Sequence, residues 1–219
     1  MGQFNLEGEK LFNDKQFKII LSNINNLIYE TNLIFDKDTI SLQEMDGANV
    51  CMVILKYNMK TSITGTYTIN LNEINKSLKL LDTGNLMINV IKNKLILKDN
   101  NQQISIDIFE PHKATTIPTL KYEYFFIINS KLFRNIINKA AQTADTLNFN
   151  KKGFKTENWK YDFPLFTDVS YSLEYLKKMI LPNSSYDLKI EYAKDYPLRV
   201  TYLTNEFSLI YILAPRNDK

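Results

Sequence analysis

Few side chains in this sequence are of types that could do covalent or zinc chemistry. It contains one histidine, His112, and one cysteine, Cys51. His112 stands beside Pro111 in a polar stretch, which is typical of a solvated loop residue. Cys51 lies inside an apolar run, which is typical of a small buried side chain. A histidine-dependent catalytic triad therefore lacks convincing partners, and a zinc cluster of histidines and cysteines is excluded.

Phosphate-binding loops and acidic metal sites have no better support. The six glycines are scattered and form neither GxGxxG nor GxxxxGK[ST]. Asp36 and Asp38 could be imagined as a metal pair, but Asp-Lys-Asp is ordinary turn chemistry, and we interpret both as part of a turn between two strands. The sequence thus predicts a protein that is not an enzyme and that uses no cofactor and no metal.

Composition restricts the class of protein further. Hydrophobic residues make up 44% of the 219 residues, which indicates a folded chain rather than a disordered one. The single cysteine excludes an intrachain disulfide and fits a reducing compartment. We see no secretion signal, and no stretch approaches the roughly 20 apolar residues of a membrane helix. We therefore expect an intracellular protein that does not enter a membrane.

Positive charge is concentrated on the predicted helices. Apolar residues at spacings of three and four predict helices over 13–28, 70–81, 129–142 and 172–181. These helices carry nine basic and three acidic residues, a balance of +6 in a chain whose net charge is +3. Such lysines have two interpretations. They can be good helix formers on a solvated helix face, or they can form a surface that binds phosphates. The basic residues are Lys15, Lys18, Lys76, Lys79, Lys131, Arg134, Lys139, Lys177 and Lys178.

The order of the predicted elements repeats along the chain. Capping-box spacing opens the first helix at Asn13 and the second at Asn70, and the turn 83–85 ends the second. The stretch 110–121 has two prolines and no helical period, so it is interpreted as a connector. Helix, strands, helix, strands then occur twice, and the second copy is shorter. Strands are predicted at 33–40, 50–58, 66–69, 86–91, 94–98, 103–109, 122–128, 145–149 and 158–163, and after the last helix.

Three separated stretches carry a resemblance to a known family. Residues 41–46 read SLQEMD and precede an apolar run, residues 70–80 read NLNEINKSLKL, and residues 213–216 read LAPR. In this order they resemble the eukaryotic and archaeal DNA sliding clamps, the proliferating cell nuclear antigen family. The family pattern is Ser-Leu-Gln-x-Met-Asp, then Asn-Leu-x-x-hydrophobic-x-Lys-x-Leu-Lys, then a terminal Leu-Ala-Pro-Lys/Arg. The resemblance covers the first half and the end of the chain.

The resemblance implies a fold and a function. The expected fold is an α+β sliding clamp, with two similar repeats of antiparallel sheet and two helices each, the helices lining the inner face of a ring. The repeats would be 1–109 and an abridged 122–219, joined by the interdomain connector 110–121. The expected function is that of a DNA polymerase processivity factor, which encircles duplex DNA and tethers replication and repair proteins. An ATP-driven clamp loader would open the ring, and the helical cations would meet phosphates.

The resemblance also implies a groove for a partner peptide. Family clamps receive there a short peptide with a glutamine anchor, an aliphatic residue and paired aromatics. The alternative is that Met45, Val50 and Met52 are only core residues. Thr115 and Ile212 depart from the family pattern, which has an aliphatic and an aromatic residue there. The implied groove residues are Met45, Asn49, Val50, Met52, Ile117, Tyr122, Pro197, Ala214, Pro215 and Arg216.

Ring closure and source stay open at the level of sequence. Family subunits pair strands across edges, which would be 103–109 and 158–163 here, and a homotrimer is the expected assembly. Because the second repeat is short, the ring could instead be weak, heteromeric or assembled on DNA. The chain could also be a clamp-fold regulator, such as a viral transcription or checkpoint-type subunit, or a β-rich interaction scaffold without a DNA role. The location would be with DNA, in a nucleus, an archaeal cytoplasm or a viral factory.

Overall fold

The computed structural model describes residues 14–59, 61–81 and 86–216, which form four helices and fifteen strands. The predicted cap Asn13 and the turn 83–85 lie outside the described residues. The elements up to the connector are α1 (Asp14–Ile24), β1 (Glu30–Asp36), β2 (Thr39–Met45), β3 (Cys51–Asn58), β4 (Gly65–Asn70), α2 (Leu71–Leu80), β5 (Met87–Ile91), β6 (Lys94–Lys98) and β7 (Gln103–Asp107). Those after it are β8 (Tyr124–Asn129), α3 (Ser130–Ala140), β9 (Thr146–Asn150), β10 (Gly153–Lys155), β11 (Lys160–Asp162), β12 (Val169–Ser172), α4 (Leu173–Met179), β13 (Asp187–Tyr192), β14 (Leu198–Leu203) and β15 (Phe207–Leu213).

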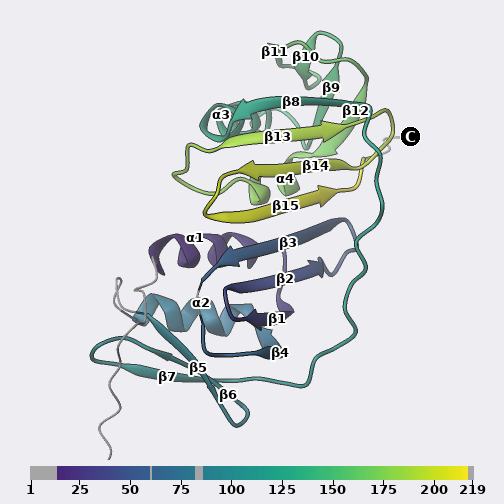
Figure 1. Cartoon of the computed structure of the whole chain (residues 1–219). Helices are drawn as coiled ribbons and strands as arrows, with labels where there is room; N and C mark the ends of the chain where they lie inside the picture. Colours follow the sequence, from purple (N-terminus) through teal and green to yellow (C-terminus); the bar gives the residue numbers. More distant parts are fainter. Residues whose placement is uncertain (1–13, 60, 82–85, 217–219) are drawn as a thin grey trace, which may run out of the picture.

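An eight-stranded antiparallel sheet runs the length of the molecule (Figure 1). Its strand order is β4-β1-β2-β3-β15-β14-β13-β8, so the two halves of the chain join where β3 pairs with β15. That junction is in register from Phe207 opposite Tyr57 to Leu213 opposite Cys51. A smaller sheet lies at each end of it: β11-β10-β9-β12 near β8, and β5-β6-β7 near β4.

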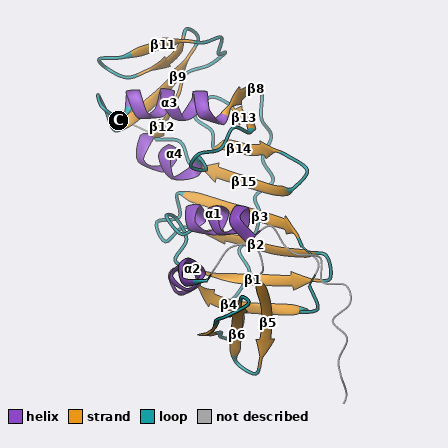
Figure 2. Cartoon of the chain, turned by 90° about the vertical axis from the view of Figure 1, so that its left-hand side faces the viewer, coloured by secondary structure: helices purple, strands orange, loops and turns teal. Residues whose placement is uncertain are grey.

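The four helices lie on one face of the long sheet, in the order α2, α1, α4, α3 (Figure 2). Each helix turns its apolar residues toward the strands, and these residues share one core with the sheet. The predicted apolar stripes account for most of this packing, because they recur at the helical period. Examples are Phe17 and Ile24 on α1, Ile74 and Leu78 on α2, Phe133 and Ile137 on α3, and Leu176 and Met179 on α4, all buried.

Two helices begin at asparagine caps that follow directly from a strand. The side chain of Asn70 accepts hydrogen bonds from the backbone N–H groups of Asn72 and Glu73. Asn129 accepts one from the backbone of Lys131 in the same way. These caps satisfy N–H groups that a helix start leaves without intrahelical partners. The predicted start of the second helix at Asn70 is confirmed.

Several expected elements differ from the structure. The strand predicted over 33–40 is wrong, because a turn separates β1 from β2, where the backbone N–H of Lys37 donates to the carboxylate of Asp36. The sequence did not predict β10 and β12, which are too short to show a period of two. Apolar spacing in the third helix predicts a buried Leu132, but this side chain is 39% exposed because the buried stripe of α3 passes through its neighbour Phe133.

The connector between the two repeats of elements is extended. The chain between Phe109 and β8 forms no helix and no strand, as predicted from its prolines. It runs along one side of the molecule from β7 to β8 (Figure 1). The start of the connector is fixed by a β-bridge, in which the backbones of Phe109 and Thr68 exchange two hydrogen bonds.

Gly153, at the start of β10, has a backbone conformation and close contacts that exclude a side chain. Its φ of +133° belongs to a region that side-chain-bearing residues rarely adopt. A Cβ there would stand 2.1 Å from the backbone oxygen of Tyr161, in the next strand. The hairpin β10·β11 therefore depends on this glycine.

We expect Gly153→Ala to lower the free energy of unfolding by more than about 2 kcal/mol, since it adds both strain and a backbone clash. The measurement is urea unfolding followed by circular dichroism. Gly47→Ala is the matched control, because a Cβ at Gly47 meets nothing within 4 Å. Equal urea midpoints for the two variants would contradict the role given to Gly153.

Candidate functional site

The first candidate surface is the outward side of the helix row. All nine predicted basic residues lie on the four helices, and hence on the face that the helix row covers. Six of them have exposed side chains, which leaves their charges in contact with solvent. Acidic residues are few there, with Glu73 and Glu174 in the first turns of α2 and α4, where the helix dipole favours them. The exposed cations are Lys15, Lys76, Lys79, Lys131, Lys139 and Lys177.

The other three predicted cations are engaged within the chain. Lys18 Nζ donates to the backbone oxygen of Leu81 at 3.0 Å. The guanidinium of Arg134 donates to the backbone oxygen of Leu181, beyond the end of α4.

Lys178, the third of these cations, forms an ion pair with Glu174 at 2.6 Å, and its hydrogen bond lowers the pKa of that carboxyl group. The Lys178 ammonium also lies 5.5 Å from the ring centroid of Tyr175. Lys18 and Arg134 thus connect elements of the fold, and Lys178 pairs within its own helix; the sequence pattern did not separate these three from the exposed set.

The second candidate surface is built around the buried carboxylate of Asp46, which is 6% exposed. Its Oδ1 accepts hydrogen bonds from the backbone N–H groups of Val50 and Cys51, each at 2.7 Å. Its Oδ2 accepts one from the hydroxyl of Tyr175 at 2.7 Å. Asn49 completes the turn in the left-handed region, with φ 57°. The aspartate of the SLQEMD motif thus fixes the turn between β2 and β3 and ties it to α4.

The same contacts change the acidity of two neighbouring groups. Burial, with the hydrogen bond to Asp46, raises the pKa of Tyr175 to about 12. Burial, with the nearby Asp46 charge, raises the pKa of Cys51 to about 12. Cys51 is therefore a buried thiol without thiolate character at neutral pH, as expected from its place in the apolar run.

The predicted groove residues of the turn and the C-terminal end lie together. The backbone N–H of Ala214 donates to the oxygen of Val50 at 2.9 Å, which places the LAPR segment beside the turn. Met45 and Val50 are partly exposed, and Asn49 is exposed. Met52 is only 1% exposed: it lies opposite Met45 on the same face of the sheet, but its side chain is covered there.

The connector is fastened to this region by side chains of β2. Gln43 Nε2 donates to the backbone oxygen of Thr115. The Thr115 hydroxyl donates to Glu44 Oε1 at 2.7 Å, so the threonine that departs from the family pattern has a polar partner here. His112 Nε2 lies 2.8 Å from Glu44 Oε2. His112 is an exposed residue of the connector, as expected, but its ring is held in place by this contact.

The far end of the connector is held by aromatic and cationic contacts. The guanidinium carbon of Arg199 lies 4.5 Å from the ring centroid of Tyr122. The Tyr122 ring meets Tyr196 edge-on, with centroids 5.6 Å apart, and Tyr196 directly precedes Pro197. Burial raises the pKa of Tyr122 to about 12, although the Arg199 charge acts in the opposite direction. Ile117, between the two ends, is 45% exposed.

Strand register brings this end of the connector into line with the turn. Arg199 is opposite Ile212, Ile212 is opposite Met52, and Met52 is opposite Met45. Tyr122, stacked on Arg199, therefore stands over the same cross-strand row as Met45. The structure brings most of the predicted groove residues to one side of the sheet. The sequence did not single out Asp46, Glu44 or Arg199, although the aspartate lay inside the motif.

Asp46 is the residue of this surface whose loss has the clearest consequence. We expect Asp46→Asn to lower the free energy of unfolding by about 2–3 kcal/mol, because a neutral amide cannot accept all of the bonds that the carboxylate accepts. Chemical unfolding measures the change. Asp38→Asn, at an exposed turn position, is the control and should stay within about 0.5 kcal/mol. Equal losses in both variants would contradict the role of Asp46.

Within residues 14–59, 61–81 and 86–216, no helix has the length and apolar character to cross a bilayer. No family model matches the chain. A DNA polymerase sliding clamp of Nanoarchaeum equitans is 28% identical, over 93% of this chain and 97% of that protein. A DNA polymerase sliding clamp of Methanocella arvoryzae is 23% identical, over 93% and 96%.

Solved structures show the same fold. A structure described as the C-terminal region of FEN-1 bound to A. fulgidus PCNA matches with a TM-score of 0.83 and 21% identity, over 95% of this chain and 98% of that one. PCNA of Thermococcus kodakaraensis matches with a TM-score of 0.78 and 14% identity, over 92% and 96%. PCNA of Entamoeba histolytica matches with a TM-score of 0.75 and 20% identity, over 92% of this chain and 95% of that one.

Proposed function

We propose that this chain, a divergent member of the proliferating cell nuclear antigen family of DNA sliding clamps, is a DNA polymerase processivity factor. It encircles duplex DNA without chemistry of its own and tethers the proteins that act there. The observation that carries this proposal is the row of four helices with six exposed cations on one face. The alternative of a scaffold without a DNA role leaves this concentration of charge unexplained.

The helix face suits contact with phosphates rather than with bases. Lysines on exposed helical positions reach the phosphate backbone, and such contacts carry no sequence information. Their strength falls steeply with salt, because each neutralised phosphate releases counterions. A spread of single lysines therefore holds duplex DNA weakly at any one place, which lets the clamp slide.

Closure of a ring is supported by a unit of four strands that occurs twice. In the first half, β4 pairs with β1, β1 with β2, and β2 with β3. In the second half, β12, β9, β10 and β11 pair in the same order, and β12 leads into α4 as β4 leads into α2. In the first half β3 continues the sheet by pairing with β15. The corresponding strand β11 has no further partner among the described residues.

A matching edge is offered by β7. Both β7 and β15 are the last strands of a three-strand antiparallel run, β5-β6-β7 and β13-β14-β15. The chain after each of them bonds to the strand that precedes a helix, with Phe109 bonded to Thr68 and the Arg216 N–H donating to the Ser170 oxygen. We propose that β7 of one copy pairs with β11 of the next as β15 pairs with β3. Exposed edges of this kind are liabilities in a monomer.

This proposed interface is shorter than its internal counterpart. β11 has three residues, whereas β3 pairs with β15 over seven positions. Fewer hydrogen bonds make a weaker junction. A homotrimer, a heteromeric ring and a ring assembled on DNA would differ mainly in what pairs with β11 and stabilises this junction. We keep the homotrimer as the proposal, with an ATP-driven loader opening the ring as the family resemblance implies.

Partner proteins would bind beside the connector. We propose the repeats 1–109 and 122–219, joined by 110–121, with the groove between connector, turn and C-terminal end. Met45, Val50, Ala214 and Pro215 form an apolar, partly exposed surface there, which suits short peptides with aliphatic and aromatic residues. Such partners would include a polymerase and repair proteins, and the protein would act wherever the cell holds its DNA.

A charge-reversed helix face tests the proposal. We expect Lys76→Glu, Lys79→Glu and Lys177→Glu together to reduce stimulation of the polymerase about tenfold or more at moderate salt, because phosphate contacts are lost. The first readout is primer extension on closed circular DNA. The second is retention of the clamp on that DNA, which should be lost when the DNA is linearised. The control combines Lys37→Glu, Lys56→Glu and Lys98→Glu, exposed residues of strands and a turn. Equal loss in both triple variants would contradict the helix face as the DNA surface.

A further inference from the structure

The repeated four-strand unit carries a second feature, a polar row on the outer face of the sheet. In the first half the row contains Thr68, opposite Asn32, and Gln43 on β2. These side chains hold the connector by its backbone. Thr68 Oγ1 donates to Glu110 O at 3.0 Å, Asn32 Nδ2 donates to His112 O at 2.8 Å, and Gln43 Nε2 donates to Thr115 O.

The second half repeats this row with nothing seated on it among the described residues. Ser170 is opposite Asn148, Asn148 is opposite Lys155, and Lys155 is opposite Lys160. The hydroxyl–amide pair recurs, since Thr68 Oγ1 lies 2.7 Å from Asn32 Oδ1 and Asn148 Nδ2 lies 3.1 Å from Ser170 Oγ. Thr68 and Asn32, under the connector, are 3% and 6% exposed, whereas Ser170 and Asn148 are only partly buried.

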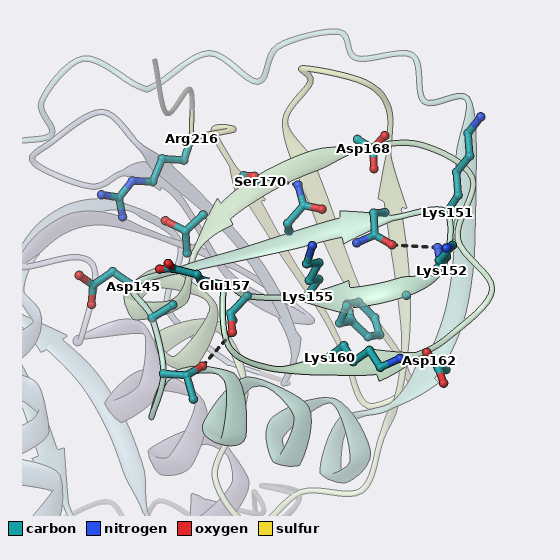
Figure 3. A pocket seen from close by; sticks show the side chains of 18 residues that line it. Asp145, Lys151, Lys152, Lys155, Glu157, Lys160, Asp162, Asp168, Ser170 and Arg216 are labelled. Atoms are coloured by element: carbon teal, nitrogen blue, oxygen red, sulfur yellow. Dashed lines mark hydrogen bonds between the residues drawn. The ribbon is translucent and has the colours of Figure 1, made fainter.

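The row crosses the floor of a hollow of about 1130 Å³ (Figure 3). Gly153 lines the same hollow and adds no side chain to fill it. Lys155 and Lys160 lie in its middle, Asp145, Glu157 and Arg216 lie toward one end, and Asp162, Asp168, Lys151 and Lys152 lie toward the other. The hollow is therefore cationic across its middle strands and carries charges of both signs at each end.

Two lysines in one cross-strand pair are unfavourable without an anion. Lys155 and Lys160 are both exposed and directly opposite, and neither forms an ion pair with a described residue. Like charges in such positions destabilise a sheet. In the first half, Gln43 on β2 is neutral and needs only the backbone of the connector. Lys155 takes the place of the neutral donor Gln43 and Lys160 that of Ile54, so the row gains two positive charges, which indicates an occupant that carries negative charge.

We propose that this face of the sheet β11-β10-β9-β12 is a second docking site, which binds an extended acidic peptide segment of a partner protein. Ser170 and Asn148 hold its backbone as Thr68 and Asn32 hold the connector, and Lys155 and Lys160 bind its carboxylates by charge-assisted hydrogen bonds. The equivalent row of the first half holds peptide backbone, which favours a peptide over nucleic acid as the occupant here. The site belongs to one chain and does not depend on ring closure.

The probe is a fluorescent peptide that copies residues 109–116 with glutamate in place of His112 and Lys113, compared with its twin that has glutamine at those places. Fluorescence anisotropy with the full chain measures both. We expect the glutamate peptide to bind more tightly than its twin, and Lys155→Glu to weaken its binding about tenfold or more. Lys37→Glu, at an exposed turn residue, should change it less than about twofold.

Thermal unfolding of the same variants gives a second readout. Lys155→Glu places opposite charges at the cross-strand pair, so its Tm should rise by about 1–3 °C. A fall in Tm, equal binding of the two peptides, or binding that Lys155→Glu leaves unchanged would overturn the proposal. Oligothymidylate serves as the nucleic-acid probe. If it bound more tightly than the glutamate peptide and Lys155→Glu abolished that binding, the face would be a nucleic-acid surface and the proposal would be overturned.

Discussion

The pairing of β3 with β15 is the constraint on which the rest of this structure depends. It joins strands that are more than a hundred residues apart, and its inner residues Val53, Leu55, Leu209 and Tyr211 are buried to 1% exposure or less. Closing so long a loop costs conformational entropy, which only an extended, buried junction can offset. The connector has to be long because this junction places the two halves end to end.

The same junction positions both candidate surfaces. On the inner side, Asn23 of α1 donates to the hydroxyl of Tyr211 at 3.0 Å and to the backbone oxygen of Lys178 at 2.7 Å, which keeps the helix row continuous across the two halves. On the outer side, β15 delivers Ala214 to the turn that Asp46 holds. A change in the pairing register would therefore disturb the lysine face and the groove together.

Much of the fold could be predicted because its signals are local. The helices follow from apolar residues at three and four, the Asn70 cap from its spacing, and the connector from its prolines. β10 and β12 could not be predicted, because strands of three and four residues show no period. Their place is set by pairing with β9, which is a tertiary property.

The site residues likewise divide into those that local sequence signals predict and those that depend on tertiary contacts. Exposed cations such as Lys76 and Lys177 follow from helix periodicity, but the partners of Lys18 and Arg134 lie at the ends of other helices. Met52 lies between Met45 and Ile212 in a row that only strand pairing sets, and the His112 ring is held by Glu44, which is 68 residues away in the sequence. These relations are distant in sequence, so residue types and spacing alone do not reveal them.

The central claim is that copies of this chain close into a ring through β7 and β11. The most direct test is the solution mass by multi-angle light scattering, over a range of concentrations and at low and moderate salt. The account predicts a species of three times the chain mass that dissociates on dilution, because the β11 edge is short. A monomer at every concentration and salt would contradict the closed homotrimer.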